Sequence, residues 1–163
     1  MAKKNVTITL YISELIYDVQ NKTYLKGRSK TDADPALVAQ MQANDDDENI
    51  NQVLRSIGEA FGTLKNKLSE HIEESGTTGN NVMQANQNIT VALKMPSNFN
   101  QAAIDVISSG MHRYIVNAAT ADWFNLTSPN DAKPHVDLAN ASMSDVLDGI
   151  NKRVRPTRTE VTP

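Results

Sequence analysis

The chain contains no cysteine, and only 5% of its 163 residues are aromatic. The lack of cysteine excludes a disulfide framework, a cysteine-ligated zinc or iron–sulfur centre and thiol catalysis. It does not distinguish an oxidising compartment from a reducing one. No apolar run approaches the roughly 18 residues that a membrane span requires. The sequence therefore predicts a protein that does not enter a membrane.

An excess of positive charge is also missing, because 16 Lys and Arg residues face 19 Asp and Glu residues and the net charge is −3. This balance excludes a generally basic nucleic-acid coat, although a local basic patch remains compatible with it. A chain of this length buries roughly two-thirds of its unfolded surface, so it needs neither a metal nor a disulfide to fold. We expect one helix-rich domain over residues 1–154 and an extended basic tail over residues 155–163.

Two segments alternate apolar and polar side chains, which is typical of half-buried strands. They are residues 6–12 and 89–95, and residues 82–85 are a candidate for a further strand. A single helix that starts at Thr7 is the alternative for the first segment. Because an isolated hairpin is marginal in water, either the strands join in one antiparallel sheet of two or three strands, or some pair with another copy of the chain.

Apolar residues spaced three and four apart predict amphipathic helices. The long ones cover residues 47–72, 98–124 and 134–154, and the short ones cover 13–25 and 36–43. Gly27 is the expected stop after the first of the short helices, and Asp34 and Pro35 are the expected N-cap and first position of the second. Residues 75–81 are rich in Gly, Ser, Thr and Asn, which indicates a loop or hinge before the β segment at 82–95. The predicted fold is helix-dominated α+β: a bundle of three long helices, one or two short helices and a small β element.

Two pairs of residues are candidates for contact with a neighbouring subunit. Gly58 and Gly62 lie four residues apart in the helix at 47–72, where each costs about 1 kcal/mol relative to alanine. Close packing should compensate, either against a helix of the same chain or against a neighbouring subunit. Trp123 and Phe124 form the largest apolar pair, and they are either buried anchors of the core or an interface hot spot.

The usual signatures of catalysis and of metal binding do not occur. His71, His112 and His135 are not at metal-ligand spacing, and there is no HExxH motif, Gly-x-Ser-x-Gly elbow or phosphate-binding glycine loop. Structural or surface roles explain the three histidines better. The sequence therefore predicts a protein that is not an enzyme and uses no cofactor and no metal.

Opposite charges gather in two places. Asp45, Asp46 and Asp47 precede a predicted helix, whose N-terminus favours carboxylates. A calcium loop is excluded, because its sixth and twelfth positions hold Ile50 and Ser56 instead of glycine and glutamate. The basic residues near the C-terminus are Lys152, Arg153, Arg155 and Arg158.

The basic C-terminal residues have three interpretations. They compensate the dipole of a helix C-terminus, dock on an acidic protein surface, or make weak non-specific contact with DNA phosphates. Aromatic residues for base stacking are not interleaved with them. Opposite charge suggests that the basic arm at residues 152–158 of one subunit pairs with the acidic run at residues 45–48 of another.

Three segments resemble a group of small virion-associated proteins from tailed phages and prophages of gut Bacteroidales. They are ITLYISELIYDVQNKTYL at residues 8–25, MPSNFN at 95–100 and NKRVRP at 151–156. The resemblance covers most of the chain and carries no mechanistic motif, so it implies no functional residue.

What the resemblance implies is a structural virion protein, made in the cytoplasm of the bacterial host. A head–tail connector or neck component fits best, acting as a homo-oligomer such as a ring and docking on portal or tail components. The alternatives are a small phage or prophage protein-binding module or regulator, and a DNA-associated accessory protein. The candidate interface residues are Gly58, Gly62, Trp123, Phe124, Asp45, Asp46, Asp47, Lys152, Arg153, Arg155 and Arg158.

Overall fold

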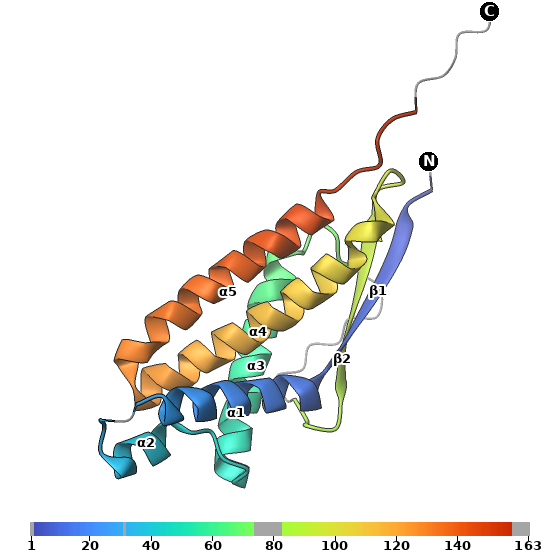
Figure 1. The fold of residues 1–163 in the computed structure, drawn as a ribbon. Coiled ribbons are helices and arrows are strands. Elements are labelled where there is room, and N and C mark those ends of the chain that lie inside the picture. Colours follow the sequence, from blue (N-terminus) through green and yellow to red (C-terminus); the bar gives the residue numbers. More distant parts are fainter. Residues whose placement is uncertain (1, 31, 74–82, 158–163) are drawn as a thin grey trace, which may run out of the picture.

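The computed structural model describes residues 2–30, 32–73 and 83–157 (Figure 1). The elements are β1 (Lys4–Tyr11), α1 (Ile12–Arg28), α2 (Pro35–Met41), α3 (Asp47–Lys67), β2 (Asn88–Met95), the 3-10 helix η1 (Gln101–Ala103), α4 (Ile104–Thr127) and α5 (Pro129–Ile150). The protein is helix-dominated with a two-stranded antiparallel sheet, as predicted. The bundle of three long helices is not confirmed, because α1 adds a fourth helix of 17 residues.

The sheet pairs two strands that are far apart in the sequence. β1 runs antiparallel to β2, with Val6 opposite Leu93 and Ile8 opposite Val91. These four side chains are buried, and the residues between them face outward. The alternative of a helix from Thr7 is therefore wrong, and β1 finds its partner within its own chain.

The beginning of α2 matches the prediction. Asp34 precedes it, and the Asp34 carboxylate accepts a hydrogen bond from the Ala36 N–H at 3.0 Å. Pro35 takes the first helical position, where its missing N–H has no cost. In α1, by contrast, the helix begins directly after β1, and Gly27 lies inside the last turn instead of beyond it.

The predicted end of the helix at 47–72 is wrong, because α3 ends at Lys67. The residues that follow lie against β2 instead. The Lys94 N–H donates to the His71 carbonyl at 2.6 Å, and the Glu73 N–H donates to the Ala92 carbonyl at 3.0 Å. Backbone pairing with the edge of β2 thus replaces the last predicted turn of the helix.

The predicted start of the last helix is also wrong, because α5 begins at Pro129 and not at Pro134. Pro129 occupies the first turn, where proline is tolerated, while Pro134 lies inside the helix and is exposed to solvent. The helix ends at Ile150, four residues before the predicted limit. Residues 83–85, part of the candidate third strand, are not in a strand.

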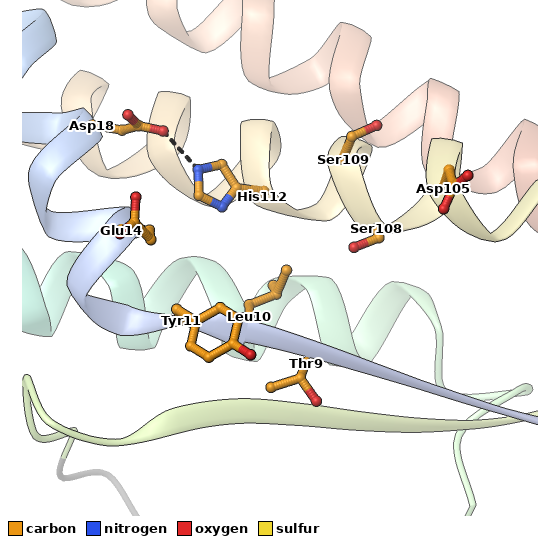
Figure 2. Close-up of a pocket in the computed structure, with 9 residues that line it drawn as sticks. All are labelled: Thr9, Leu10, Tyr11, Glu14, Asp18, Asp105, Ser108, Ser109 and His112. Carbon is orange, nitrogen blue, oxygen red and sulfur yellow. Dashed lines mark hydrogen bonds and ion pairs between the residues drawn. The ribbon is translucent and has the colours of Figure 1, made fainter.

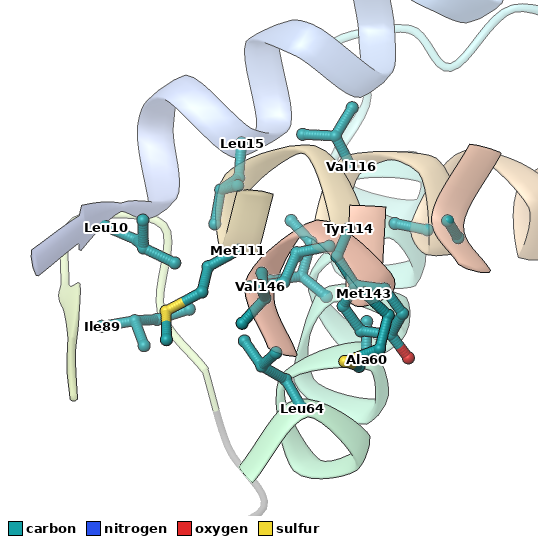
Figure 3. Close-up of a cluster of buried hydrophobic side chains, with 14 of the residues drawn as sticks. Leu10, Leu15, Ala60, Leu64, Ile89, Met111, Tyr114, Val116, Met143 and Val146 are labelled. Atoms are coloured by element: carbon teal, nitrogen blue, oxygen red, sulfur yellow. The ribbon is translucent and has the colours of Figure 1, made fainter. Parts of the chain in front are cut away.

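Helix α4 is the centre of the molecule. It runs antiparallel to α5, and α1, α3 and the sheet surround its remaining sides (Figure 1). Met111 on α4 is fully buried, and its side chain extends toward Leu10 of β1 and Ile89 of β2 (Figure 3). One hydrophobic core therefore joins both strands to the helices.

Helices α4 and α5 approach each other closely at two glycines. A β-carbon on Gly110 would lie 2.7 Å from Cγ2 of Val146, and one on Gly149 would lie 2.7 Å from Cγ1 of Ile107. Real β-carbon contacts are longer, so glycine is required at both positions for this crossing.

Three predictions fall partly or wholly outside the described residues. They are the hinge at 75–81, residue 82 of the β segment, and the part of the tail that begins at Arg158. Within the described ranges, none of the helices combines the length and the apolar character needed to cross a membrane.

Candidate interaction surface

An open groove of about 380 Å³ lies between β1, α1 and α4 (Figure 2). Its lining residues are Thr9, Leu10, Tyr11, Glu14, Asp18, Asp105, Ser108, Ser109 and His112. The first five come from β1 and α1, and the last four lie on one face of α4. The chain folds into this arrangement because α1 continues directly from β1 and crosses α4, which leaves the polar side of α4 uncovered beside the strand.

The edge of β1 that is not paired with β2 borders this groove. On β2, the Lys94 N–H and the Ala92 carbonyl point away from β1, since both bond to residues 71–73. In an antiparallel ladder, the residues opposite them also point their backbone groups outward. Asn5 is opposite Lys94 and Thr7 is opposite Ala92. The N–H and C=O groups of Asn5, Thr7 and, two residues on, Thr9 therefore form an open edge.

The open edge, defined by the backbone groups of Asn5, Thr7 and Thr9, accepts no strand from any part of the chain that the structure describes. It lacks two of the devices that usually block strand addition, a bulge and a proline, while Lys4 places one positive charge at the start of the strand. β1 pairs in continuous register over eight residues, without a bulge and without proline. Such an edge is a template for pairing with another chain.

The groove is negatively charged. Glu14 lies in the first turn of α1 and Asp105 in the first turn of α4, where the helix dipole stabilises a carboxylate without a cation. Neither forms an ion pair with a described residue. The Asp18 carboxylate is hydrogen-bonded to Nε2 of His112, with 2.7 Å between Oδ2 and Nε2. We call the cavity with these three carboxylates the acidic groove.

The contact between Asp18 and His112 joins α1 to α4, and it is visible as the dashed line in Figure 2. Sequence reasoning gave His112 a structural or surface role, and this hydrogen bond between two helices is compatible with that role. In the described ranges, no group of three or more His, Cys, Asp or Glu side chains is arranged to hold a metal ion.

A second polar cluster, between α1 and the start of α5, is closed by its own contacts. Asp131 bonds to Lys30, lies 3.4 Å from Lys26 and accepts a hydrogen bond from Ser128 at 2.6 Å. Burial raises the pKa of Asp131, but the hydrogen bonds from Lys30 and Ser128 and the charges of both lysines outweigh it, so the pKa is lowered. The cluster leaves no carboxylate free to bind a partner.

His135 borders this closed cluster, with its ring centroid 5.3 Å from that of Phe124. Burial lowers the pKa of His135, and the nearby charges of Lys22 and Lys26 lower it further. The Nδ1 atom is buried and has no hydrogen-bond partner among the described residues. His135 is therefore a neutral packing residue at pH 7.

The aromatic candidates Trp123 and Phe124 are both buried. Trp123 is 7% exposed and donates a hydrogen bond from Nε1 to the Met41 carbonyl at 2.8 Å, while Phe124 is fully buried. Both are anchors of the core, which was the first of the two interpretations. Neither offers an exposed surface to a partner.

The glycine candidates do not mark a helix crossing within the chain. Among the described residues, a β-carbon on Gly58 would meet only Met83, at 3.7 Å or more, and one on Gly62 would have no atom within 4 Å. The interpretation of a close crossing within the chain is therefore wrong. Packing of this face against a neighbouring subunit stays a prediction.

The charged candidates lie at opposite ends of the molecule (Figure 1). Asp45, Asp46 and Asp47 are exposed at the start of α3, whereas Lys152, Arg153 and Arg155 follow the end of α5. Asp45 accepts a hydrogen bond from Gln20 at 2.9 Å. Within the described part of one chain, Lys152, Arg153 and Arg155 therefore form no ion pair with the acidic run.

Only part of the basic group is available for an intermolecular contact. Arg153 donates to the Ile150 carbonyl at 2.6 Å, so its guanidinium is used within the chain. Lys152 and Arg155 are exposed and form no ion pair with a described residue. Arg158 lies outside the described residues.

Sequence reasoning missed the acidic groove. Asp18 and His112 are 94 residues apart, and Glu14 and Asp105 each read as ordinary first-turn acids. One signal could have indicated an open strand edge in this region. The strand predicted at residues 6–12 has no other predicted strand next to it in the sequence.

No family model, no curated protein and no solved structure matches this chain.

Proposed function

We propose that the protein is a non-enzymatic structural component of a tailed-phage virion, a head–tail connector or neck protein that acts by self-association and docking. The placement in a virion comes from the resemblance of residues 8–25, 95–100 and 151–156 to virion-associated proteins. The mode of action is supported by the surface of the molecule.

The observation that carries the self-association is the open edge of β1 beside the acidic groove, together with a basic tail elsewhere on the same chain. Two different and complementary surfaces on one subunit produce a heterologous contact, which closes into a ring or continues as a filament. An open strand edge is a template for pairing with another chain. A regulator that acts as a monomer does not require one.

The non-enzymatic role is supported by what the charged side chains do. Asp18 with His112, Arg113 with Asp145, and Asp131 with two lysines each join two helices. The contacts of Asp131 stabilise the arrangement of α1 and α5, whereas the exposed pair of Arg113 and Asp145 contributes little. An assembly protein requires this rigidity, since its surfaces must repeat with the same geometry in every subunit.

Light scattering of the purified chain, from micromolar to about millimolar concentration, tests self-association, and mass spectrometry of purified phage particles tests the virion role. We expect a concentration-dependent closed species and the presence of the chain in particles. A chain that stays a monomer or a dimer and is absent from particles would support the binding-module alternative instead. Binding to duplex DNA that falls steeply with salt would support the DNA-associated alternative.

A further inference from the structure

We propose that the C-terminal tail of a second copy adds as a strand to the open edge of β1, with its basic side chains over the acidic groove. This inference rests on the proposed self-association and names the two surfaces that perform it. Strand addition supplies affinity through main-chain hydrogen bonds, and the side chains of the added strand supply specificity.

The tail has the composition of a strand. Residues 157–162 read TRTEVT, in which four of six residues are β-branched. Pro156 and Pro163 flank this segment, so both residues that lack an N–H lie outside it. Six residues in a strand span about 20 Å, which matches the length of β1 from Asn5 to Leu10.

The described part of the tail favours a second copy over the tail's own chain. The Val154 N–H donates to the Asn98 carbonyl at 2.8 Å, and the described residues after Val154 form no hydrogen bond with the body. Figure 1 shows them leading away from the sheet and from α5. The six residues that follow position 157 reach at most about 20 Å. A tail that reversed its direction would retain too few residues to form a strand on its own β1.

Charge complementarity selects the groove. Glu14 and Asp105 are exposed and form no ion pair with a described residue, and the same is true of Arg155 on the tail. Within the donor segment Arg158 is positive and Glu160 is negative, so Arg155, just before the segment, supplies the net positive charge. Opposite charges on two surfaces that lack internal partners steer association and fix its register.

The acidic run at residues 45–47 is a weaker acceptor for the tail. It offers charge but no strand edge, since its residues lie at the start of a helix. Asp45 is bonded to Gln20, and the Asp46 carbonyl accepts from the Ile50 N–H at 2.9 Å. A contact made by charge alone at an exposed site contributes little.

The sharpest test removes one donor from the open edge of the full-length chain. The Thr7 N–H points away from β2, so Thr7→Pro deletes an edge donor and keeps the hydrogen bonds between β1 and β2. We expect association, followed by light scattering, to weaken by about tenfold or more. The matched control Thr7→Val retains the N–H and the β-branched shape and should associate as the parent does. Circular dichroism and thermal unfolding verify that each variant is folded.

A second pair of variants tests the tail without altering the body. Arg155→Gln with Arg158→Gln should weaken association by about tenfold and reduce its dependence on salt. The control replaces Asp45, Asp46 and Asp47 by asparagine and should leave association unchanged. The reverse pattern, with the control impaired and the arginine variant unaffected, would assign the tail to the acidic run and overturn the inference.

A synthetic peptide of residues 152–163 separates this inference from the proposed function. Added to the full-length chain, it should dissociate the oligomer and slow amide hydrogen exchange at Thr7 and Thr9. If the chain associates but neither the peptide nor the variants have an effect, self-association stands and the inference is overturned. If the chain neither associates nor binds the peptide, both fail. Protection of Thr7 and Thr9 that does not change on dilution would show that the tail binds its own chain.

Discussion

The two faces of α4 differ in how completely they are filled. The face toward α5 has no room for a methyl group at Gly110, where a β-carbon would lie 2.7 Å from Val146. The face toward β1 borders an open cavity of about 380 Å³, lined by polar side chains such as Ser108 and Asp105. One helix thus combines a close-packed contact and an open one.

This difference separates side chains that hold the fold together from those available to a partner. At the α4–α5 crossing, every added atom must displace another, because protein interiors are close-packed. In the acidic groove, the polar groups remain hydrated and the adjacent strand edge is open. Substitutions on the first face should therefore change stability, and those on the second should change association only.

The largest effect on stability is expected for Gly110→Ala. The new methyl group would lie 2.7 Å from Cγ2 of Val146, and a valine on a helix cannot turn away without leaving its preferred rotamer. We expect the free energy of unfolding in urea to fall by about 2 kcal/mol. The double variant with Val146→Ala should recover part of the loss caused by Gly110→Ala. An unchanged stability of the single variant would show that the crossing is looser than described.

The closed cluster around Asp131 offers a polar region to compare with the acidic groove. The Asp131 side chain is 11% exposed, and Asp131→Asn should lower the free energy of unfolding by about 1–2 kcal/mol at pH 7, since it removes a charged acceptor from two lysines and Ser128. Because the pKa of Asp131 is lowered in the folded state, the parent gains this stability above the ordinary carboxyl pKa of about 3.9. It loses the gain as the pH falls through the lower, folded value.

The difference between the parent and Asp131→Asn should therefore disappear at low pH in urea unfolding measured across this range. Asp145→Asn is the matched control, since the Asp145 side chain is 51% exposed and pairs with an exposed Arg113. Its effect should stay below about 0.5 kcal/mol at every pH. Equal losses in both variants would contradict the distinction between closed and open polar sites.

Gly62→Ala should have the opposite sign to Gly110→Ala. A β-carbon at Gly62 would meet no atom of a described residue within 4 Å, so the change removes only the conformational freedom of glycine in the middle of α3. We expect thermal unfolding to show a gain of about 0.5–1 kcal/mol. If the gain appears but the oligomer is lost, the face around Gly62 is a contact with a neighbouring subunit.

The smallest effect on stability is expected inside the groove. Ser108→Ala removes a hydroxyl that lies on the open face of α4 and forms no hydrogen bond with a described residue. The free energy of unfolding should change by less than about 0.5 kcal/mol. A loss as large as that of Gly110→Ala would mean that the groove is part of the core.

Most of the secondary structure was predictable because its signals are local. The alternation at residues 6–12 and 89–95 predicted both strands, and Asp34 with Pro35 marked the start of α2. The errors occurred where a distant contact outweighs the local pattern. Residues 71–73 continue an apolar seam, yet they leave the helix because β2 offers them backbone hydrogen bonds.

The candidate interaction surface was less predictable. The opposite charges at residues 45–47 and in the tail can be read from the sequence. The sequence does not show that the start of α3 and the end of α5 lie at opposite ends of the molecule. Burial of Trp123 and Phe124 was one of two interpretations, and the choice required knowledge of what covers the end of α4. Glu14 and Asp105 gave no signal, since each alone is an ordinary acid in the first turn of a helix.

The sequence by itself determined which segments become helices and strands, the lack of cysteine chemistry and the basic character of the tail. These properties depend on residues within a few positions of each other. Only the tertiary structure decided that β1 pairs with β2, that α4 and α5 approach each other closely at Gly110 and Gly149, and that three carboxylates line one groove beside an open strand edge. Such features depend on which distant segments come to lie side by side, because burial and backbone pairing are properties of the packed chain.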